Sequence, residues 1–337
     1  MPSPLVTIVT PIYQGAAHVA ACVESVRAQN YENWIHILVD NRSTDGTEEI
    51  LRELSAEDSR MRCVFCEEHV GMVANWNRAL ALVPDDSVYV RQLYVDDRLT
   101  PTCLSRTIDA AERNPDVAIV SSFFLNGKRR LPRTALSRET RINGRDVVRR
   151  LFLGGPDYLA QPSVLLLRRK IISGWPEIYV AKGFPPGLSG EPPLSQADKE
   201  GLLDTLLVSD LLFVPEQLVH LREDPDSATG YSWRVGSWHA GWMELLMRHG
   251  AKFFEPNEIS RLMRRLTFKY VRSSVWRSLK GKGLFDGKFS DFRQHSIAYL
   301  IPALRSRGFV REAQALTLLA RVVGAHRTID DSTLSRR

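Results

Sequence analysis

Short apolar runs alternate with segments of helical spacing along the first 125 residues, and this alternation constrains the fold more than any other feature. In residues 16–29, for example, Val19, Cys22 and Val26 fall on one helical face. The runs typical of strands are Leu5–Thr10, Ile35–Val39, Arg62–Phe65, Val88–Tyr94 and Val117–Ser121. This order predicts an α/β fold, a mostly parallel sheet flanked by helices, with ligands bound at the carboxyl ends of the strands.

Beyond Phe124 the pattern is looser. Residues 126–141 are polar and basic, residues 183–193 are crowded with Gly and Pro, and both predict loops. Leu211–Leu221 predicts two short strands broken at Pro215, after a helix near Ala197–Leu207. From residue 236 onward the apolar spacing is helical.

We therefore expect a large α/β domain over residues 1–234, with a donor half (1–125) and an acceptor half (126–234). A helical appendage over 235–327 and a disordered tail over 328–337 follow. Hydrophobic residues make up 44% of the chain and charged ones 25%, which is typical of a globular protein.

Charge is distributed unevenly. Residues 1–234 carry a net charge of −5 and residues 235–337 a net +11, which together give the chain's +6. A basic module favours an anionic partner, either lipid headgroups or nucleic acid, although a solvated helical face would have the same composition. No apolar run approaches the roughly 20 residues that span a bilayer. Without a basic, cleavable leader, we expect a cytoplasmic protein, peripheral at the inner face of the membrane.

Polar and aromatic clusters follow three of the expected strands. Pro11 and Tyr13 follow the first, where an aromatic ring can stack on a base, and Asp40 and Asn41 open an Asx-rich segment after the second. Such a segment can bind a ribose or simply cap a helix. Asp96 and Asp97 follow the fourth strand, and two adjacent carboxylates repel each other unless a cation such as Mg²⁺ offsets their charge.

Together these clusters resemble the family 2 glycosyltransferases of the GT-A fold. That family has a Pro-x-Tyr-like turn, then a Val-Asp-Asp-Gly-Ser-Thr-Asp-Gly-Thr-like segment, then an Asp-x-Asp-like metal motif before a Leu-x-Pro helix start. Here the matches are Pro11–Tyr13, Val39–Thr47 and Tyr94–Pro101, with the glycine-led segment Val70–Leu80 between the last two. Tyr94 stands in place of the first motif aspartate, and Asn41 and Arg42 where many relatives have Asp and Gly.

The resemblance implies an inverting transfer of sugar from a nucleoside diphosphate sugar to a saccharide or lipid-linked hydroxyl, in bacterial surface-glycan assembly. It also implies a divalent cation, Mn²⁺ or Mg²⁺, held by Asp96 and Asp97. The donor would be bound by Pro11, Tyr13, Asp40, Asn41, Gly71, Asn75 and Asp96.

The family's catalytic base matches Asp198, at the expected start of a helix, where an acid can equally serve the helix dipole. Glu191, Glu200 and Asp204 are the alternatives for the base. The family's strand beneath the acceptor pocket matches Gln161–Leu165 followed by Arg168 and Arg169.

Two other classes of function remain open. A nucleotide-sugar-binding module without catalysis would explain Tyr94. A nucleic-acid-binding protein would explain the basic C-terminal region, although the chain has no helix-turn-helix, zinc-finger or aromatic RNA-binding signature.

Overall fold

The computed structural model describes residues 3–180, 196–222, 237–279, 297 and 300–322. By its internal contacts the chain forms two compact units, the first made of residues 1–180 and 198–223, the second of 181–197 and 224–337. The boundary expected at residue 234 and the tail expected over 328–337 lie outside the described residues.

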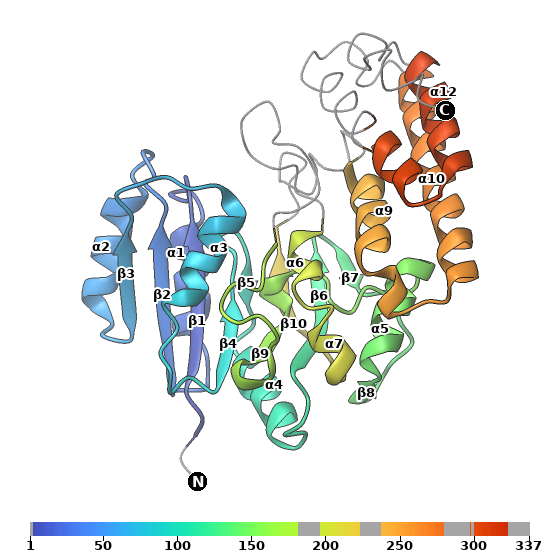
Figure 1. Ribbon diagram of the computed structural model, residues 1–337. Helices are drawn as coiled ribbons and strands as arrows, with labels where there is room; N and C mark the ends of the chain where they lie inside the picture. The colour runs from blue at the N-terminus through green and yellow to red at the C-terminus, as the bar shows by residue number, and fades with distance from the viewer. Residues whose placement is uncertain (1–2, 181–195, 223–236, 280–296, 298–299, 323–337) are drawn as a thin grey trace. The chain divides into compact units, whose positions relative to one another are not determined.

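The first unit is an α/β domain built on one ten-stranded sheet (Figure 1). Its strands are β1 Val6–Ile12, β2 Trp34–Asp40, β3 Met61–Phe65, β4 Tyr89–Gln92, β5 Arg98–Leu99, β6 Ile119–Asn126, β7 Arg129–Leu131, β8 Thr140–Ile142, β9 Leu166–Arg168 and β10 Leu211–Leu221. Its helices are α1 Val19–Arg27, α2 Thr47–Glu57, α3 Met72–Ala81, α4 Cys103–Glu112, α5 Gly144–Leu153, α6 Ala197–Glu200 and α7 Thr205–Val208, with 3₁₀ turns η1 Pro162–Val164 and η2 Arg169–Ile171.

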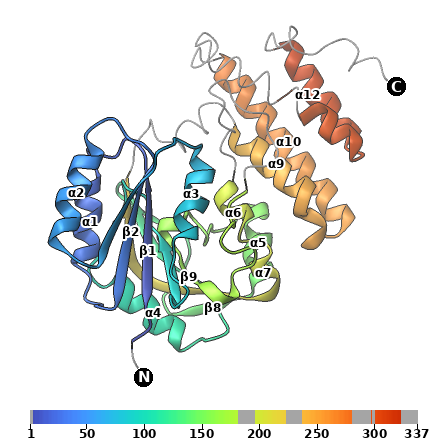
Figure 2. The same cartoon turned by 60° about the vertical axis from the view of Figure 1, so that its left-hand side comes forward.

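The donor half of the sheet is fully parallel, in the order β3-β2-β1-β4. All seven residues of β1 are buried, because helices cover both faces of this central strand. Figure 2 shows α1 and α2 on one side of β1 and β2 and α3 on the other. The strand order reverses at β1, so the carboxyl ends of β1 and β4 meet at a topological switch point, where ligands of such sheets bind.

The acceptor half is mixed. β9 lies antiparallel between β4 and β6, whereas β6 and β10 pair in parallel. The expected α/β class is confirmed, and parallel pairing dominates only in the donor half.

Several expectations for the acceptor half were wrong in detail. Leu211–Leu221 is one strand, not two, because a shift in its register against β6 between Val214 and Gln217 accommodates Pro215. Residues 126–141 include β7 and β8 rather than loop alone. Pro162–Val164 is a 3₁₀ turn, and the expected helix 197–207 is divided into the short α6 and α7.

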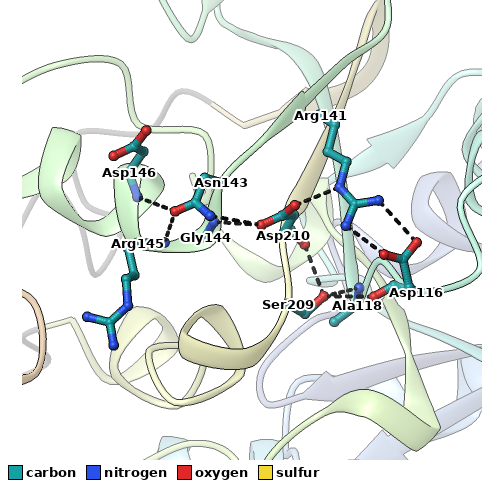
Figure 3. Close-up of polar contacts among 9 residues, drawn as sticks. All are labelled: Asp116, Ala118, Arg141, Asn143, Gly144, Arg145, Asp146, Ser209 and Asp210. Carbon is teal, nitrogen blue, oxygen red and sulfur yellow. Dashed lines mark hydrogen bonds and ion pairs between the residues drawn. The ribbon is translucent and has the colours of Figure 1, made fainter.

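The start of β10 is tied to β8, α5 and β6 by one polar cluster (Figure 3). The guanidinium of Arg141 lies between two carboxylates, 2.6 Å from Asp116 Oδ2 and 2.6 Å from Asp210 Oδ2. The other oxygen of Asp210 accepts from the backbone N of Gly144 at 3.1 Å. The first turn of α5 therefore lies directly against the chain entering β10.

The second unit is helical, as expected. It contains α9 Ser237–His249, a 3₁₀ turn Gly250–Lys252, α10 Pro256–Leu279 and α12 Val310–Val322, and α10 packs against both α9 and α12. In the part of the chain that the structure describes, no helix combines the length and apolarity needed to cross a bilayer.

Gly144 offers a test of this packing. A Cβ there would lie 2.2 Å from the carbonyl oxygen of Ser209 and 2.3 Å from that of Leu206, both backbone atoms. We expect Gly144→Ala to lower the free energy of unfolding by about 1–3 kcal/mol, the usual cost of overpacking. Urea denaturation followed by circular dichroism measures it.

The matched control is Gly71→Ala, because a Cβ at Gly71 meets no atom within 4 Å and the backbone φ of −59° suits alanine. Equal stability of the two variants would contradict the described contact between α5 and the chain before β10.

Candidate functional site

The parallel register brings the three predicted clusters to one edge of the sheet. Ile12, the last residue of β1, pairs with Asp40, the last residue of β2, and Val9 pairs with Gln92 at the end of β4. The segments that follow these strands, containing Tyr13, Asn41 and Asp96, therefore leave the sheet at the same edge.

Tyr13 is the exposed member of the first cluster. Pro11 is buried within β1, whereas Tyr13 is 52% exposed, with its ring centroid 4.4 Å from that of His69. A half-exposed aromatic ring at a strand end can stack on a nucleotide base.

The segment after β2 is held to the segment after β1 by side-chain-to-backbone hydrogen bonds. Ser43 Oγ accepts from the backbone N of Gln14 at 2.9 Å, Thr47 Oγ1 from that of Gly15 at 2.9 Å, and Asp45 Oδ2 from that of Ala16 at 3.0 Å. These polar residues therefore build the edge rather than offer their side chains to a ligand.

Asp40 and Asn75 present unused acceptors. Asp40 is 2% exposed; its Oδ2 accepts from the backbone N of Ser43 at 3.1 Å, and its Oδ1 has no hydrogen-bond partner among the described residues. Asn75, in the first turn of α3 after Gly71, is 4% exposed, and its Oδ1 has none among them either. Buried acceptors without partners are costly, so both are suited to donors from a ligand.

The amide of Asn41 is engaged within the protein. Its Nδ2 donates to the carbonyl of Val70 at 2.7 Å, and its Oδ1 accepts from the backbone N of Val70 at 3.0 Å. These two hydrogen bonds to the backbone of Val70 fix the segment that leads into Gly71 and α3. A direct contact of Asn41 with a donor stays a prediction.

The two aspartates of the motif after β4 have different surroundings. Asp97 is 2% exposed, and its Oδ2 accepts from Gln161 Nε2 at 2.6 Å and from Ser163 Oγ at 2.5 Å, while its Oδ1 accepts from the backbone N of Arg222 at 3.2 Å. The Asp96 side chain is 28% exposed, with Oδ2 3.3 Å from Arg222 Nε. Only Asp96 is open to solvent.

The electrostatics of this pair fit a cation. Burial and the charge of Asp96 raise the pKa of Asp97 to about 7, although hydrogen bonds from Ser163, Arg222 and Gln161 oppose the shift. Two adjacent carboxylates thus face the single guanidinium of Arg222, and a divalent ion would supply the remaining counter-charge. Among the described residues no three His, Cys, Asp or Glu side chains form a metal cluster, and Mg²⁺ commonly uses one or two carboxylates with phosphate and water.

Tyr94, in place of the first motif aspartate, belongs to an aromatic group. Its ring stacks on Trp76 with centroids 5.3 Å apart, and Trp76 meets Tyr179 edge-on at 5.3 Å. Burial raises the pKa of both tyrosines, and the charge of Asp198 raises it further. Asp198 therefore lies close to the motif that contains Asp96 and Asp97.

The position of Asp198 depends on the next residue, Lys199, which is buried and makes three polar contacts. Lys199 is 3% exposed, its Nζ lies 3.1 Å from Asp157 Oδ2 and 3.9 Å from Asp198 Oδ2, and it donates to the carbonyl of Ala160. Burial raises the pKa of Asp198, with the charge of Lys199 opposing the shift. A carboxylate with a raised pKa and a 19% exposed side chain is suited to accept a proton.

Of the alternative bases, Asp204 is exposed, Glu200 is buried in α6, and Glu191 lies outside the described residues.

The sequence did not point to Arg222, and it predicted Gln161 and Ser163 only as part of a strand beneath the acceptor pocket. In the structure, Gln161 and Ser163 both donate hydrogen bonds to the carboxylate of Asp97. No local signal distinguishes Arg222, because it contacts Asp96 from 126 positions further along the chain.

Comparison with known proteins gives a family match. The protein-family model described as Glycosyl transferase family 2 matches residues 7–174 of this chain. Glycosyltransferase GlyG of Streptococcus pneumoniae serotype 4 is 29% identical over 122 residues, which are 36% of this chain and 40% of GlyG. The O-antigen biosynthesis protein RfbC of Myxococcus xanthus is 30% identical over 119 residues, 35% of this chain and 9% of RfbC.

In eight curated relatives, among them these two, the matched segments make up between 9% and 49% of the relative's own length. Among solved structures, residues 1–349 of S. aureus TarS in complex with UDP-GlcNAc align with a TM-score of 0.64 at 12% identity, over 98% of this chain and 91% of that chain. The TarS likeness establishes the GT-A fold.

Asn41 and Arg42 give a prediction for this site. Asn41→Asp removes the donor to the Val70 carbonyl and sets a carboxylate against it, so we expect the free energy of unfolding to fall by about 1–3 kcal/mol. Arg42 has a φ of 64°, where non-glycine residues carry a cost of about 1 kcal/mol, so Arg42→Gly should be neutral or slightly stabilising.

Urea denaturation of the two single variants measures both effects. An Asn41→Asp protein as stable as the Arg42→Gly protein would mean that the amide does not fix the segment before α3.

Proposed function

Through residues 7–174 this chain belongs to glycosyl transferase family 2, and on that premise we propose that it is an inverting glycosyltransferase acting in bacterial surface-glycan assembly. It moves a sugar from a nucleoside diphosphate sugar to a hydroxyl of a saccharide or lipid-linked acceptor, with peripheral contact to a membrane. The observation that carries the proposal is the gathering of Tyr13, Asp40, Asp96 and Asp198 around one edge of the sheet, at its switch point.

The donor side uses the groups that the fold leaves available. Tyr13 stacks on the base, and the free oxygens of Asp40 and Asn75 accept from base or ribose donors. Gly71 allows close approach of the donor to the start of α3, since the space beside its Cα is empty. Asn41 acts by holding this start in place.

The transfer is a direct displacement at the anomeric carbon. Asp198 takes the proton of the acceptor hydroxyl as that oxygen attacks, and configuration inverts because no covalent sugar intermediate forms. Asp96, with Asp97 behind it, would hold the divalent cation, Mn²⁺ or Mg²⁺, which when bound supplies counter-charge for the departing diphosphate. Asp97 keeps the motif in position through its three hydrogen bonds.

The two motif aspartates should differ when replaced. Asp96→Ala should abolish the metal-dependent part of donor binding and leave the melting temperature unchanged, because Asp96 is partly exposed. Asp97→Ala should also lower the melting temperature, because the partly buried amide of Gln161 and the buried hydroxyl of Ser163 lose their acceptor. Thermal shift with a panel of nucleoside diphosphate sugars, with Mn²⁺ or with chelator, measures both.

Asp86→Ala is the control, since Asp86 is exposed and the change of charge is the same. Donor binding by Asp96→Ala with unaltered metal dependence would remove Asp96 from the cation site.

Asp198 separates transfer from mere donor binding. Asp198→Asn nearly preserves shape, so donor affinity should persist while turnover falls by about 10² to 10⁴-fold, the usual contribution of a general base. Release of nucleoside diphosphate from the donor, with water as acceptor, provides a first assay. Because burial raises the pKa of Asp198, the wild-type rate should rise with pH in a range above the ordinary pKa of an aspartate. The Asp198→Asn variant should not show this rise.

Asp86→Asn is the matched control, because Asp86 is an exposed aspartate and is none of the candidate bases. If Asp198→Asn keeps near-normal turnover, another residue is the base. If the wild type binds donor and shows no turnover with any acceptor, the chain is a nucleotide-sugar-binding module, the alternative that Tyr94 favours.

A further inference from the structure

Helix α10 has one face packed in the second unit and one face open. Leu262, Met263, Leu266 and Tyr270 are buried, on the side that packs against α9 and α12. From residue 261 to residue 272, the exposed side chains of this helix are Arg261, Arg264, Arg265, Phe268, Lys269 and Arg272. At about 100° per residue, these six side chains cover an arc of about 140°. We call them the α10 basic face.

The α10 basic face is strongly cationic. Burial, followed by the charge of nearby Arg265, lowers the pKa of Lys269, as expected where like charges gather. The one acid of this helix, Glu258, lies in the first turn, and its Oε2 accepts from the backbone N of Glu255. Arg261, Arg264 and Arg272 form no ion pair with any residue that the structure describes.

An aromatic ring lies near the middle of this face. Phe268 is 66% exposed, whereas Leu262, Leu266 and Tyr270 on the packed face of the same helix are at most 6% exposed. A partner that offered only negative charges would pair with the arginines and the lysine but would leave the phenylalanine ring in water. The interface of an anionic bilayer accepts both groups, since the cations meet phosphate headgroups and the ring enters the acyl boundary.

We propose that the α10 basic face docks this protein on an anionic lipid bilayer, with Phe268 inserted between the headgroups. A second copy of the chain that presents the same face is disfavoured as the occupant, because two such faces repel each other. This docking specifies the membrane contact of the proposed function. It rests on that function, because a lipid-linked acceptor would lie in the bilayer. Docking itself needs no nucleotide, so it is tested apart from transfer.

The test uses the full chain without donor, sedimented with phosphatidylcholine vesicles that contain or lack phosphatidylglycerol, at increasing salt. The wild type should bind only the anionic vesicles and be released by salt. Each basic side chain contributes roughly fivefold to partitioning. The triple variant Arg261→Gln, Arg264→Gln, Arg272→Gln should therefore bind about 100-fold more weakly, and Phe268→Ser about tenfold more weakly.

The matched control is Lys128→Gln, Arg129→Gln, Arg133→Gln, which removes the same charge from exposed residues of the first unit. It should stay within about threefold of the wild type. Circular dichroism of each variant checks its folding, and we expect all of them to be folded because the substituted side chains are exposed.

Three outcomes would overturn the proposal. One is failure of the wild type to sediment with anionic vesicles at low salt, and another is an equal loss in both triple variants. The third is loss of binding to single-stranded RNA in the α10 variant while vesicle binding is unchanged, which would make this face a nucleic-acid site. Donor binding in solution, measured separately, is unaffected by any of these results and tests the transferase proposal alone.

Discussion

The buried carboxylate of Asp97 is the interaction on which the candidate site depends. A charge at 2% exposure is unfavourable unless hydrogen bonds and opposite charge compensate for its lost hydration. Here the compensation comes from Gln161, Ser163 and the backbone of Arg222, which lie 64, 66 and 125 residues further along the chain. The segment after β4, the turn before β9 and the end of β10 therefore cannot move independently. This arrangement leaves Asp96 directed toward solvent.

The same turn before β9 reaches the candidate base. Gln161 contacts Asp97, while the preceding residue, Ala160, accepts a hydrogen bond from Lys199, next to Asp198. Asp157 adds an ion pair to Lys199 at 3.1 Å and accepts from the backbone N of Ala160. A short, mutually bonded stretch thus links the motif of Asp96 and Asp97 to the candidate base Asp198, and the proposed displacement reaction would require such fixed relative positions.

Tyr94 acquires a physical explanation from its neighbours. An aspartate there would face the rings of Trp76 and Tyr179 and the charge of Asp198. Burial among aromatic rings and a second carboxylate disfavours another negative charge, whereas a tyrosine ring packs. The chain therefore carries its acidic pair two residues later, at Asp96 and Asp97, where hydrogen-bond donors are present.

The sequence alone determined the α/β class, the three polar clusters at strand ends and the helical C-terminal unit, because local periodicity and strand-end chemistry depend on residues close together in the chain. It also gave the resemblance that singled out Asp198. Only the tertiary structure distinguished Asp96 from Asp97, engaged the Asn41 amide with Val70, joined Leu211–Leu221 into one strand and brought Arg222 to Asp96. These features depend on strand order and register, which decide the hydrogen-bond partners of residues more than a hundred positions apart and leave no local pattern in the sequence.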